Sequence, residues 1–157
     1  HIFDHNNPPP VSLEGMPCIH TAPSLRKVGD KWEKICVGTT TSTRMDRFTP
    51  GLIGQYGVRA IIGKGGLYQG SLDAMQKYGA VYLAIVGGAA ALETEQIEEV
   101  EAVYFEELHP EALYRFRVKN FGPLTVAMDS HGVHLYDQVT ENVKKKLPEI
   151  YAKLGVL

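Results

Sequence analysis

Hydrophobic and polar positions alternate in blocks through the middle of the chain. Residues 58–62 form an apolar run, residues 71–78 place apolar side chains at helical spacing, and residues 80–86 are apolar without a break. An unbroken apolar run is typical of a strand that is covered on both faces. Strand, helix and covered strand in this order predict a parallel crossover unit, which is right-handed in nearly all proteins.

Shorter elements are predicted on the N-terminal side of this unit. Residues 18–21 are strand-like, and the period-two alternation of residues 32–37 indicates a half-buried strand. Thr49 and Pro50 predict the N-cap and the first residue of a short helix over residues 51–56. We therefore expect two strands and one helix before the crossover unit.

The C-terminal third is predicted to contain strands followed by a helix. Residues 115–119 and 124–129 are expected to pair with each other around Gly122, and a short strand is expected at residues 133–136. Apolar residues at helical spacing follow, and Pro148 is expected to kink or restart that helix.

The predicted elements form one α/β domain over residues 1–157, with a Pro-rich arm over residues 1–17. Residues 87–92 are interpreted as a helix of small residues, and residues 96–108 fit either a helix or a strand. No internal repeat or domain boundary is visible in the sequence.

Composition excludes several classes of protein. The 157 residues are 44 % hydrophobic and 22 % charged, as in an ordinary soluble globular protein. No apolar run approaches the roughly 18 residues that a membrane helix needs. A formal charge of −2 is too little basic excess for a nucleic-acid binder. We therefore expect neither a membrane nor a nucleic acid as partner.

The cysteines and the start of the chain bear on cofactors and location. Cys18 and Cys36 cannot ligate an iron–sulfur cluster or a structural zinc unaided, so we expect them to be reduced, buried and structural. No signal peptide opens the sequence, which favours the cytoplasm. The sequence begins at His1 without methionine, which indicates that an N-terminal piece is absent.

Polar side chains between the second predicted strand and the first helix are the densest chemical signal. Five hydroxyls and one guanidinium follow one another over residues 39–44, and such donors suit an oxyanion. A Gly-Lys-Gly-Gly turn over residues 63–66 follows a strand of the crossover unit, at the edge where open α/β sheets place their ligands. Together they predict a cationic site for a small dianion. Separately, each fits an ordinary surface loop, and His20 is interpreted as a loop contact.

An ordered series of motifs resembles the β subunit, or C-terminal domain, of class I iron–sulfur hydro-lyases, a family of class I fumarate hydratases and L(+)-tartrate dehydratases. The similarity covers nearly all of residues 18–136. The motifs are Gly-Thr-Thr-Thr-Ser-Thr-Arg-Met-Asp (38–46), Ile-Gly-Lys-Gly (62–65), Ala-Val-Tyr-Leu followed by Gly-Gly-Ala-Ala-Ala-Leu (80–92), Glu-Ala-Leu-Tyr-Arg-Phe-Arg-Val (111–118) and Asp-Ser-His-Gly (129–132).

The resemblance implies a swivelling β/β/α domain with a mixed sheet and flanking helices. It also implies a partner α subunit that supplies the cysteines of a [4Fe–4S] cluster, so that this chain ligates no metal. Carried over by motif, Arg44 would clamp a carboxylate, Lys64 would add charge on the other side, and Thr40 would hydrogen-bond the substrate or assist proton transfer. The further substrate-binding candidates are Thr41, Ser42 and Gly65.

The reaction implied by the resemblance is the reversible hydration of fumarate to malate, with this chain as the β subunit of the hydro-lyase in an assembly such as α2β2. Two alternatives stay open: the β subunit of an L(+)-tartrate dehydratase, and a non-catalytic module that binds a dicarboxylate or regulates an assembly. The isolated chain is expected to be inactive.

The sequence departs from the family pattern at two places. Thr39 stands where family members usually carry proline, which alters backbone stiffness ahead of the hydroxyl run. The Arg-Asp-x-x-His motif, whose arginine is another substrate ligand in the family, has no counterpart in this sequence. If the sequence starts after a further segment, that segment can carry the motif; if the chain starts at His1, the site is incomplete.

Overall fold

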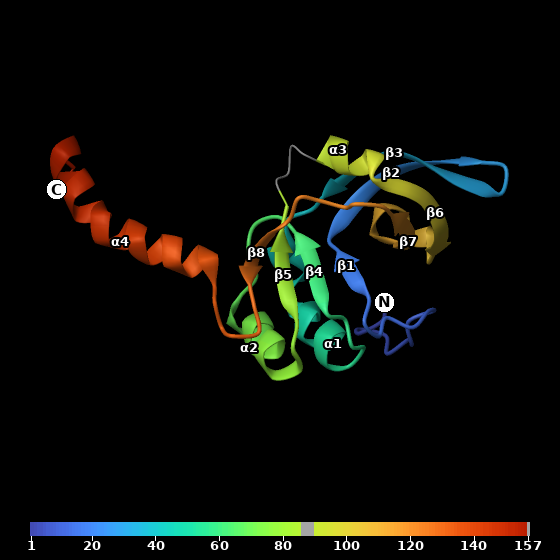
Figure 1. The fold of residues 1–157 in the computed structure, drawn as a ribbon, viewed down its shortest axis with the longest axis horizontal. Helices are drawn as coiled ribbons and strands as arrows, with labels where there is room; N and C mark the ends of the chain where they lie inside the picture. Colours follow the sequence, from blue (N-terminus) through green and yellow to red (C-terminus); the bar gives the residue numbers. More distant parts are fainter. Residues whose placement is uncertain (86–89, 157) are drawn as a thin grey trace.

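The structure is a computed structural model that describes residues 1–85 and 90–156. At its centre lies a four-stranded mixed sheet in the order β1-β4-β5-β8 (Figure 1). The first three strands are parallel and the last is antiparallel: β1 (Pro17–Ile19), β4 (Ala60–Gly63), β5 (Val81–Ala84) and β8 (Thr125–Met128).

The crossover unit has the predicted form. Helix α2 (Gln69–Tyr78) connects the parallel strands β4 and β5, and Gly79 ends it in the left-handed conformation, at φ 72°. Helix α1 (Thr49–Gly54) packs beside α2. Both helices bury apolar side chains against the sheet, in a core that includes Leu52, Ile53, Ile61, Leu72, Met75, Tyr82 and Met128. The expected α/β fold with a mixed sheet and flanking helices is therefore confirmed.

Two hairpins extend from the central sheet. β2 (Thr21–Val28) pairs with β3 (Lys31–Thr39) in antiparallel fashion. β6 (Ile97–Tyr104) pairs with β7 (Leu113–Val118), and the 3₁₀ helix η3 (Glu106–Glu111) joins them. The segment that fitted either a helix or a strand is thus mainly β6.

The predicted pairing of residues 115–119 with residues 124–129 is wrong. β7 pairs with β6, while β8 returns to the central sheet and pairs with β5. β8 buries Ala127 and Met128 in the apolar core, whereas β7 carries exposed arginines that form ion pairs with glutamates of β6. These different surroundings place the two strands in different sheets.

The predicted N-cap at Thr49 is also wrong. The 3₁₀ helix η1 (Ser42–Phe48) runs directly into α1, so Thr49 has helical backbone angles. Its hydroxyl donates instead to the carbonyl of Met45 at 3.1 Å. The chain between the hairpin and the crossover unit is therefore a continuous pair of helical segments.

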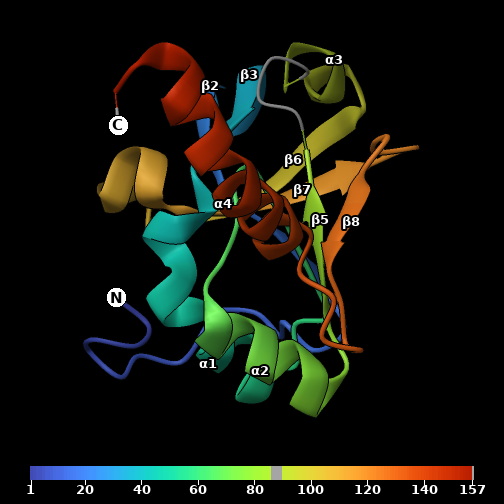
Figure 2. The ribbon, with the colours of Figure 1, turned by 90° about the vertical axis from the view of Figure 1, so that its left-hand side faces the viewer.

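Helix α4 (Leu135–Leu154) projects from the body of the molecule (Figure 1), and seen from that side it lies in front of the central sheet (Figure 2). None of its residues is buried. The strand predicted at residues 133–136 is wrong, because only an isolated bridge at His134 precedes the helix. The helix does not restart at Pro148, since water can satisfy the freed carbonyl on so exposed a helix. No helix of the described residues is long and apolar enough to cross a membrane.

The N-terminal arm packs over α1. Phe3 stacks on Phe48 with ring centroids 5.6 Å apart, and the Gly15 N–H donates to the Gly57 carbonyl at 2.9 Å. Farther along the chain, part of the predicted small-residue helix, residues 87–89, lies outside the described residues. α3 (Ala90–Glu95) covers the rest of that prediction.

Candidate functional site

The hydroxyl-rich loop and the Gly-Lys-Gly-Gly turn lie side by side. Thr41 and Lys64 form an isolated parallel bridge, and the Ser42 N–H donates to the Lys64 carbonyl at 3.0 Å. The loop follows β3, and the turn follows β4 at the carboxyl edge of the parallel strands. Two segments about twenty residues apart in sequence therefore lie next to each other through backbone contacts, and the common cationic site of their side chains stays a prediction.

Arg44 and Thr40 occupy the loop side of this surface. The Arg44 guanidinium donates to Thr40 Oγ1 at 3.2 Å and lies 3.6 Å from a carboxylate oxygen of Glu111. Its side chain is 65 % exposed, so the fork of donors stays accessible to a ligand. Glu111, which comes from η3, is a neighbour that the motif reading did not include.

Lys64, Thr41 and Gly65 occupy the turn side. Lys64 is half-buried, and no described carboxylate forms an ion pair with it. Gly65 is exposed and has φ +73°, a conformation that favours glycine. Thr41 is exposed. Among the described residues, Glu111 therefore partly neutralises the charge of Arg44, whereas no carboxylate is paired with Lys64.

Ser42 does not share this exposed surface. Its side chain is fully buried, and its Oγ lies 2.9 Å from the hydroxyl of Tyr82. The same Tyr82 hydroxyl donates to the carbonyl of Gly65 at 3.0 Å. Burial raises the pKa of Tyr82 to about 12, so this hydroxyl keeps its proton. A Cβ at Gly63 would collide with Ser42 Oγ. Ser42 and Tyr82 therefore hold the loop and the turn together from below.

Asp46 fixes the other end of η1. Its Oδ1 accepts the backbone N–H of Tyr68 at 2.8 Å and the hydroxyl of Ser71 at 2.7 Å, both at the start of α2. Sequence reasoning missed this role and that of Tyr82. The available signal for Tyr82 was a hydroxyl inside an otherwise apolar covered strand, because a buried phenol normally needs a partner.

His20 lies directly behind the loop. His20 is only 4 % exposed. Its backbone N–H donates to the Ile62 carbonyl at 2.8 Å, and its backbone carbonyl accepts the Thr40 N–H at 3.0 Å. Both ring nitrogens lack a hydrogen-bond partner within the described ranges. Burial lowers the pKa of His20 to about 4, so the ring is neutral near pH 7. His20 is therefore a buried residue whose backbone joins β4 to the loop, whereas the sequence predicted only a loop contact.

Comparison with known proteins adds the family. Residues 1–139 match the family model described as the fumarase C-terminus. The chain belongs to this family. The match includes the loop, the turn and His20, and it ends within the first turns of α4.

Similar members of the fumarase C-terminal family carry two kinds of name. The chain is 42 % identical over 151 residues to the putative L(+)-tartrate dehydratase subunit beta of Methanocaldococcus jannaschii, covering 95 % of this chain and 77 % of that protein. It is 42 % identical over 144 residues to the L(+)-tartrate dehydratase subunit beta of Escherichia coli K12, covering 91 % and 70 %. It is 37 % identical over 151 residues to a putative fumarate hydratase class I of Geobacillus stearothermophilus, covering 95 % and 29 %.

The residues of this family member that could hold a metal are dispersed. Among the residues that the structure describes, no group of three His, Cys, Asp or Glu side chains could bind a metal ion. Burial raises the pKa of the Cys18 thiol to about 11, which disfavours the thiolate that metal binding needs. The expectation of a buried Cys36 is wrong, because this residue is exposed on β3, in the hairpin with β2. The described residues therefore do not fit an iron–sulfur cluster.

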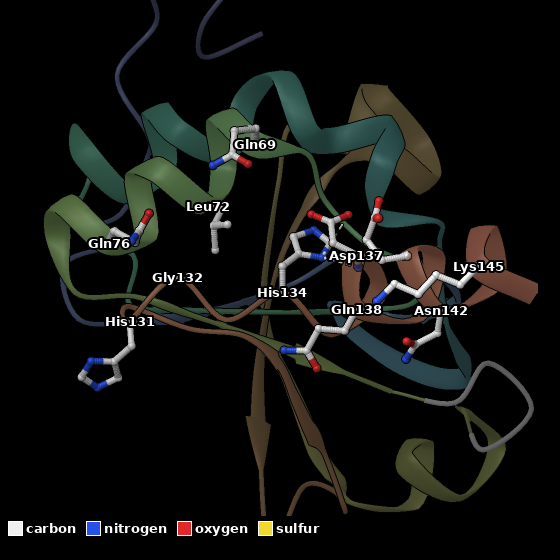
Figure 3. A pocket seen from close by; sticks show the side chains of 11 residues that line it. Gln69, Leu72, Gln76, His131, Gly132, His134, Asp137, Gln138, Asn142 and Lys145 are labelled. Atoms are coloured by element: carbon white, nitrogen blue, oxygen red, sulfur yellow. Dashed lines mark hydrogen bonds and ion pairs between the residues drawn. The ribbon is translucent and has the colours of Figure 1, made fainter.

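A cleft lies away from these residues. A cleft of about 770 Å³ opens between α2 and the start of α4 (Figure 3), and none of the six predicted site residues lines it. His134 at its base is fully paired: Nε2 lies 3.0 Å from the Leu67 carbonyl and Nδ1 accepts the Asp137 N–H at 3.1 Å. The rim of the cleft carries amide and charged side chains from the two helices, including Gln69, Gln76, Asp137, Gln138, Asn142 and Lys145.

Proposed function

We propose that this chain is the β subunit of a two-subunit hydro-lyase that reversibly hydrates fumarate to malate. The observation that carries the proposal is the backbone contact between Thr41 and Lys64, which joins the hydroxyl loop and the lysine turn into one surface. A dicarboxylate needs cations at two places, and this surface offers Arg44 and Lys64 from separate segments. Membership of the fumarase C-terminal family supports the same reaction class.

Each predicted residue has a role that its surroundings support. Arg44 presents an exposed fork that can bind one carboxylate through two parallel hydrogen bonds. Lys64 adds a half-buried positive charge, and Thr40 hydrogen-bonds the substrate or assists proton transfer at its hydroxyl. Thr41 and Gly65 are exposed beside Lys64 and complete the binding surface. Ser42 acts from the interior, through Tyr82.

The chemistry requires these cations. When water adds to a double bond that is conjugated to a carboxylate, negative charge develops on that carboxylate as the β-carbon is attacked. Fixed positive groups at the carboxylate stabilise this charge without reorganisation during the reaction. The bonds from Ser42 and Asp46 to the core and to α2 keep η1, and with it Arg44, in place before substrate arrives.

The remaining half of the site belongs to an α subunit. In this proposal a [4Fe–4S] cluster held entirely by the α subunit supplies Lewis-acid chemistry at the substrate hydroxyl and carboxylate. This chain contributes binding and orientation, and an α2β2 assembly fits the division. Relatives named as subunit beta support a two-subunit enzyme.

The proposal is tested by assaying this chain alone and after co-purification with its partner, with iron analysis of the complex. We expect no activity from the chain alone and fumarate hydration by the complex. Activity without partner or iron would contradict the scheme. Arg44→Lys in the complex should lower turnover because the planar fork is lost, whereas unchanged turnover would favour a non-catalytic dicarboxylate-binding module.

A second candidate reaction is the dehydration of L(+)-tartrate to oxaloacetate. It is favoured by the names of the relatives, since the tartrate dehydratase subunits above are 42 % identical and the fumarate hydratase is 37 % identical. Both substrates are four-carbon dicarboxylates that the same two cations can hold. Comparing kcat/KM for fumarate, malate and L(+)-tartrate with one preparation of the complex separates the two reactions.

A further inference from the structure

The position of the His20 ring follows from the register of the central sheet. β1 and β4 are parallel and Ile19 lies opposite Ile62, so His20 continues the ladder opposite Gly63. Residues opposite each other in a parallel pair project from the same face of the sheet. On that face, the space at Gly63 is taken by Ser42 Oγ. The His20 ring therefore lies on the face of the sheet where the Ser42 and Tyr82 hydroxyls meet.

Among the described residues, the His20 ring and the Thr39 hydroxyl are the polar groups next to the loop that are buried without a hydrogen-bond partner. Ser42, Tyr82 and Asp46 all form side-chain hydrogen bonds, whereas neither nitrogen of the buried His20 ring has a partner within residues 1–85 and 90–156. Buried polar groups are nearly always paired, because an unpaired one costs free energy. A ring that only filled space could be apolar at no such cost. An unpaired polar ring behind a binding loop thus points to a function in another state of the site.

We propose that His20 is a positioning residue of this site, whose neutral imidazole forms its hydrogen bond to the loop of residues 38–46 only when a dicarboxylate is bound. The inference rests on the proposed function. His20 is already joined to this loop, because its carbonyl accepts the Thr40 N–H at 3.0 Å. Rotation of a loop hydroxyl toward the ring, with the backbone of η1 kept in place by Ser42 and Asp46, would form this hydrogen bond, and the ring would then hold Thr40 and Arg44 in the binding geometry.

The test compares two buried histidines in the co-purified complex. His20→Phe removes a ring without partners, so we expect the thermal midpoint to stay within about 2 °C of the wild type or to rise, while kcat falls at least about tenfold. His20→Gln keeps a neutral donor and acceptor and should restore most of the turnover. The control is His134→Phe, which breaks two existing hydrogen bonds and should lower the midpoint by roughly 4 °C or more with turnover per folded complex unchanged.

The proposal is overturned if His20→Phe behaves as His134→Phe does, or if it changes neither stability nor turnover. Should His20→Phe not fold, ¹⁵N-histidine NMR of the wild-type complex decides. Addition of succinate, a dicarboxylate that cannot be hydrated, should shift a ring nitrogen of His20, and an unchanged resonance would contradict the proposal. Arg44→Lys in the same turnover assay separates the proposed function from the proposed role of His20. Loss of turnover in that variant alone leaves the proposed function standing without the role of His20.

Discussion

The carboxyl edge of the central sheet and the cleft beside α4 are built in opposite ways. At the sheet edge, exposed groups such as Arg44 stand on a buried polar layer in which Tyr82 and Asp46 tie loop, turn and helix together. The cleft has a volume of about 770 Å³, but its α4 wall contains no buried residue. Chemistry needs groups that are held in place, so the supported surface is the better candidate.

The sharpest way to break this comparison is Lys64→Ala in the assembled enzyme. If Lys64 stabilises the developing carboxylate charge as proposed, removing this half-buried charge should lower kcat/KM by about 10²–10³-fold. The matched control is Lys145→Ala, which removes a lysine that lines the cleft and should leave kcat/KM within about twofold. Equal losses in the two variants would move the functional site toward the cleft.

Acid should weaken the sheet edge through His20. Burial lowers the pKa of His20 to about 4, from 6.5 for an exposed ring. For a lowered pKa, the contribution to stability is fully present above pH 6.5 and is lost as the pH falls toward 4. Acidification across this window should lower the free energy of unfolding by up to roughly 3 kcal/mol through this group. Denaturant titrations of the wild type and of His20→Gln at several pH values measure this loss. A difference in unfolding free energy between the two proteins that stays constant from pH 7 to pH 4 would refute the expectation.

Tyr82→Phe tests the support beneath the site. Loss of the hydroxyl leaves Ser42 Oγ and the Gly65 carbonyl without this partner, so the free energy of unfolding should fall by about 2 kcal/mol. The control is Tyr68→Phe, whose ring is 63 % exposed and which should change stability by less than about 0.5 kcal/mol. Chemical denaturation of both variants provides the measurement, and equal stabilities would mean that the buried layer contributes nothing.

The smallest effect is expected from Asp46→Ala. This change removes the acceptor at the start of α2 and should cost about 1 kcal/mol of unfolding free energy. Asp73→Ala is a suitable comparison, because Asp73 lies on α2 and its carboxylate accepts a hydrogen bond only from the exposed Gln69 side chain. A larger loss for Asp73→Ala would argue against the anchoring of η1 on α2.

Much of the fold could be predicted because buried strands and helices place apolar residues at regular intervals along the sequence. The apolar runs of β4 and β5 and the glycine after α2 marked the crossover unit. The turn after β4 and the loop after β3 lie in backbone contact with each other. The partner strands of β7 and of β8 could not be predicted in this way. Alternation tells which face of a strand is buried and says nothing of which strand lies next to it.

The sequence by itself determined the α/β class and the crossover unit and singled out the polar groups of the candidate site, because residue type and spacing are local properties. Only the tertiary structure decided that Ser42 faces inward, that Tyr82 bridges loop and turn, and that the His20 ring is buried without a partner. These facts depend on groups that lie far apart in the chain. They meet only when the strands are packed side by side, and hydrogen bonding and burial act on that packing.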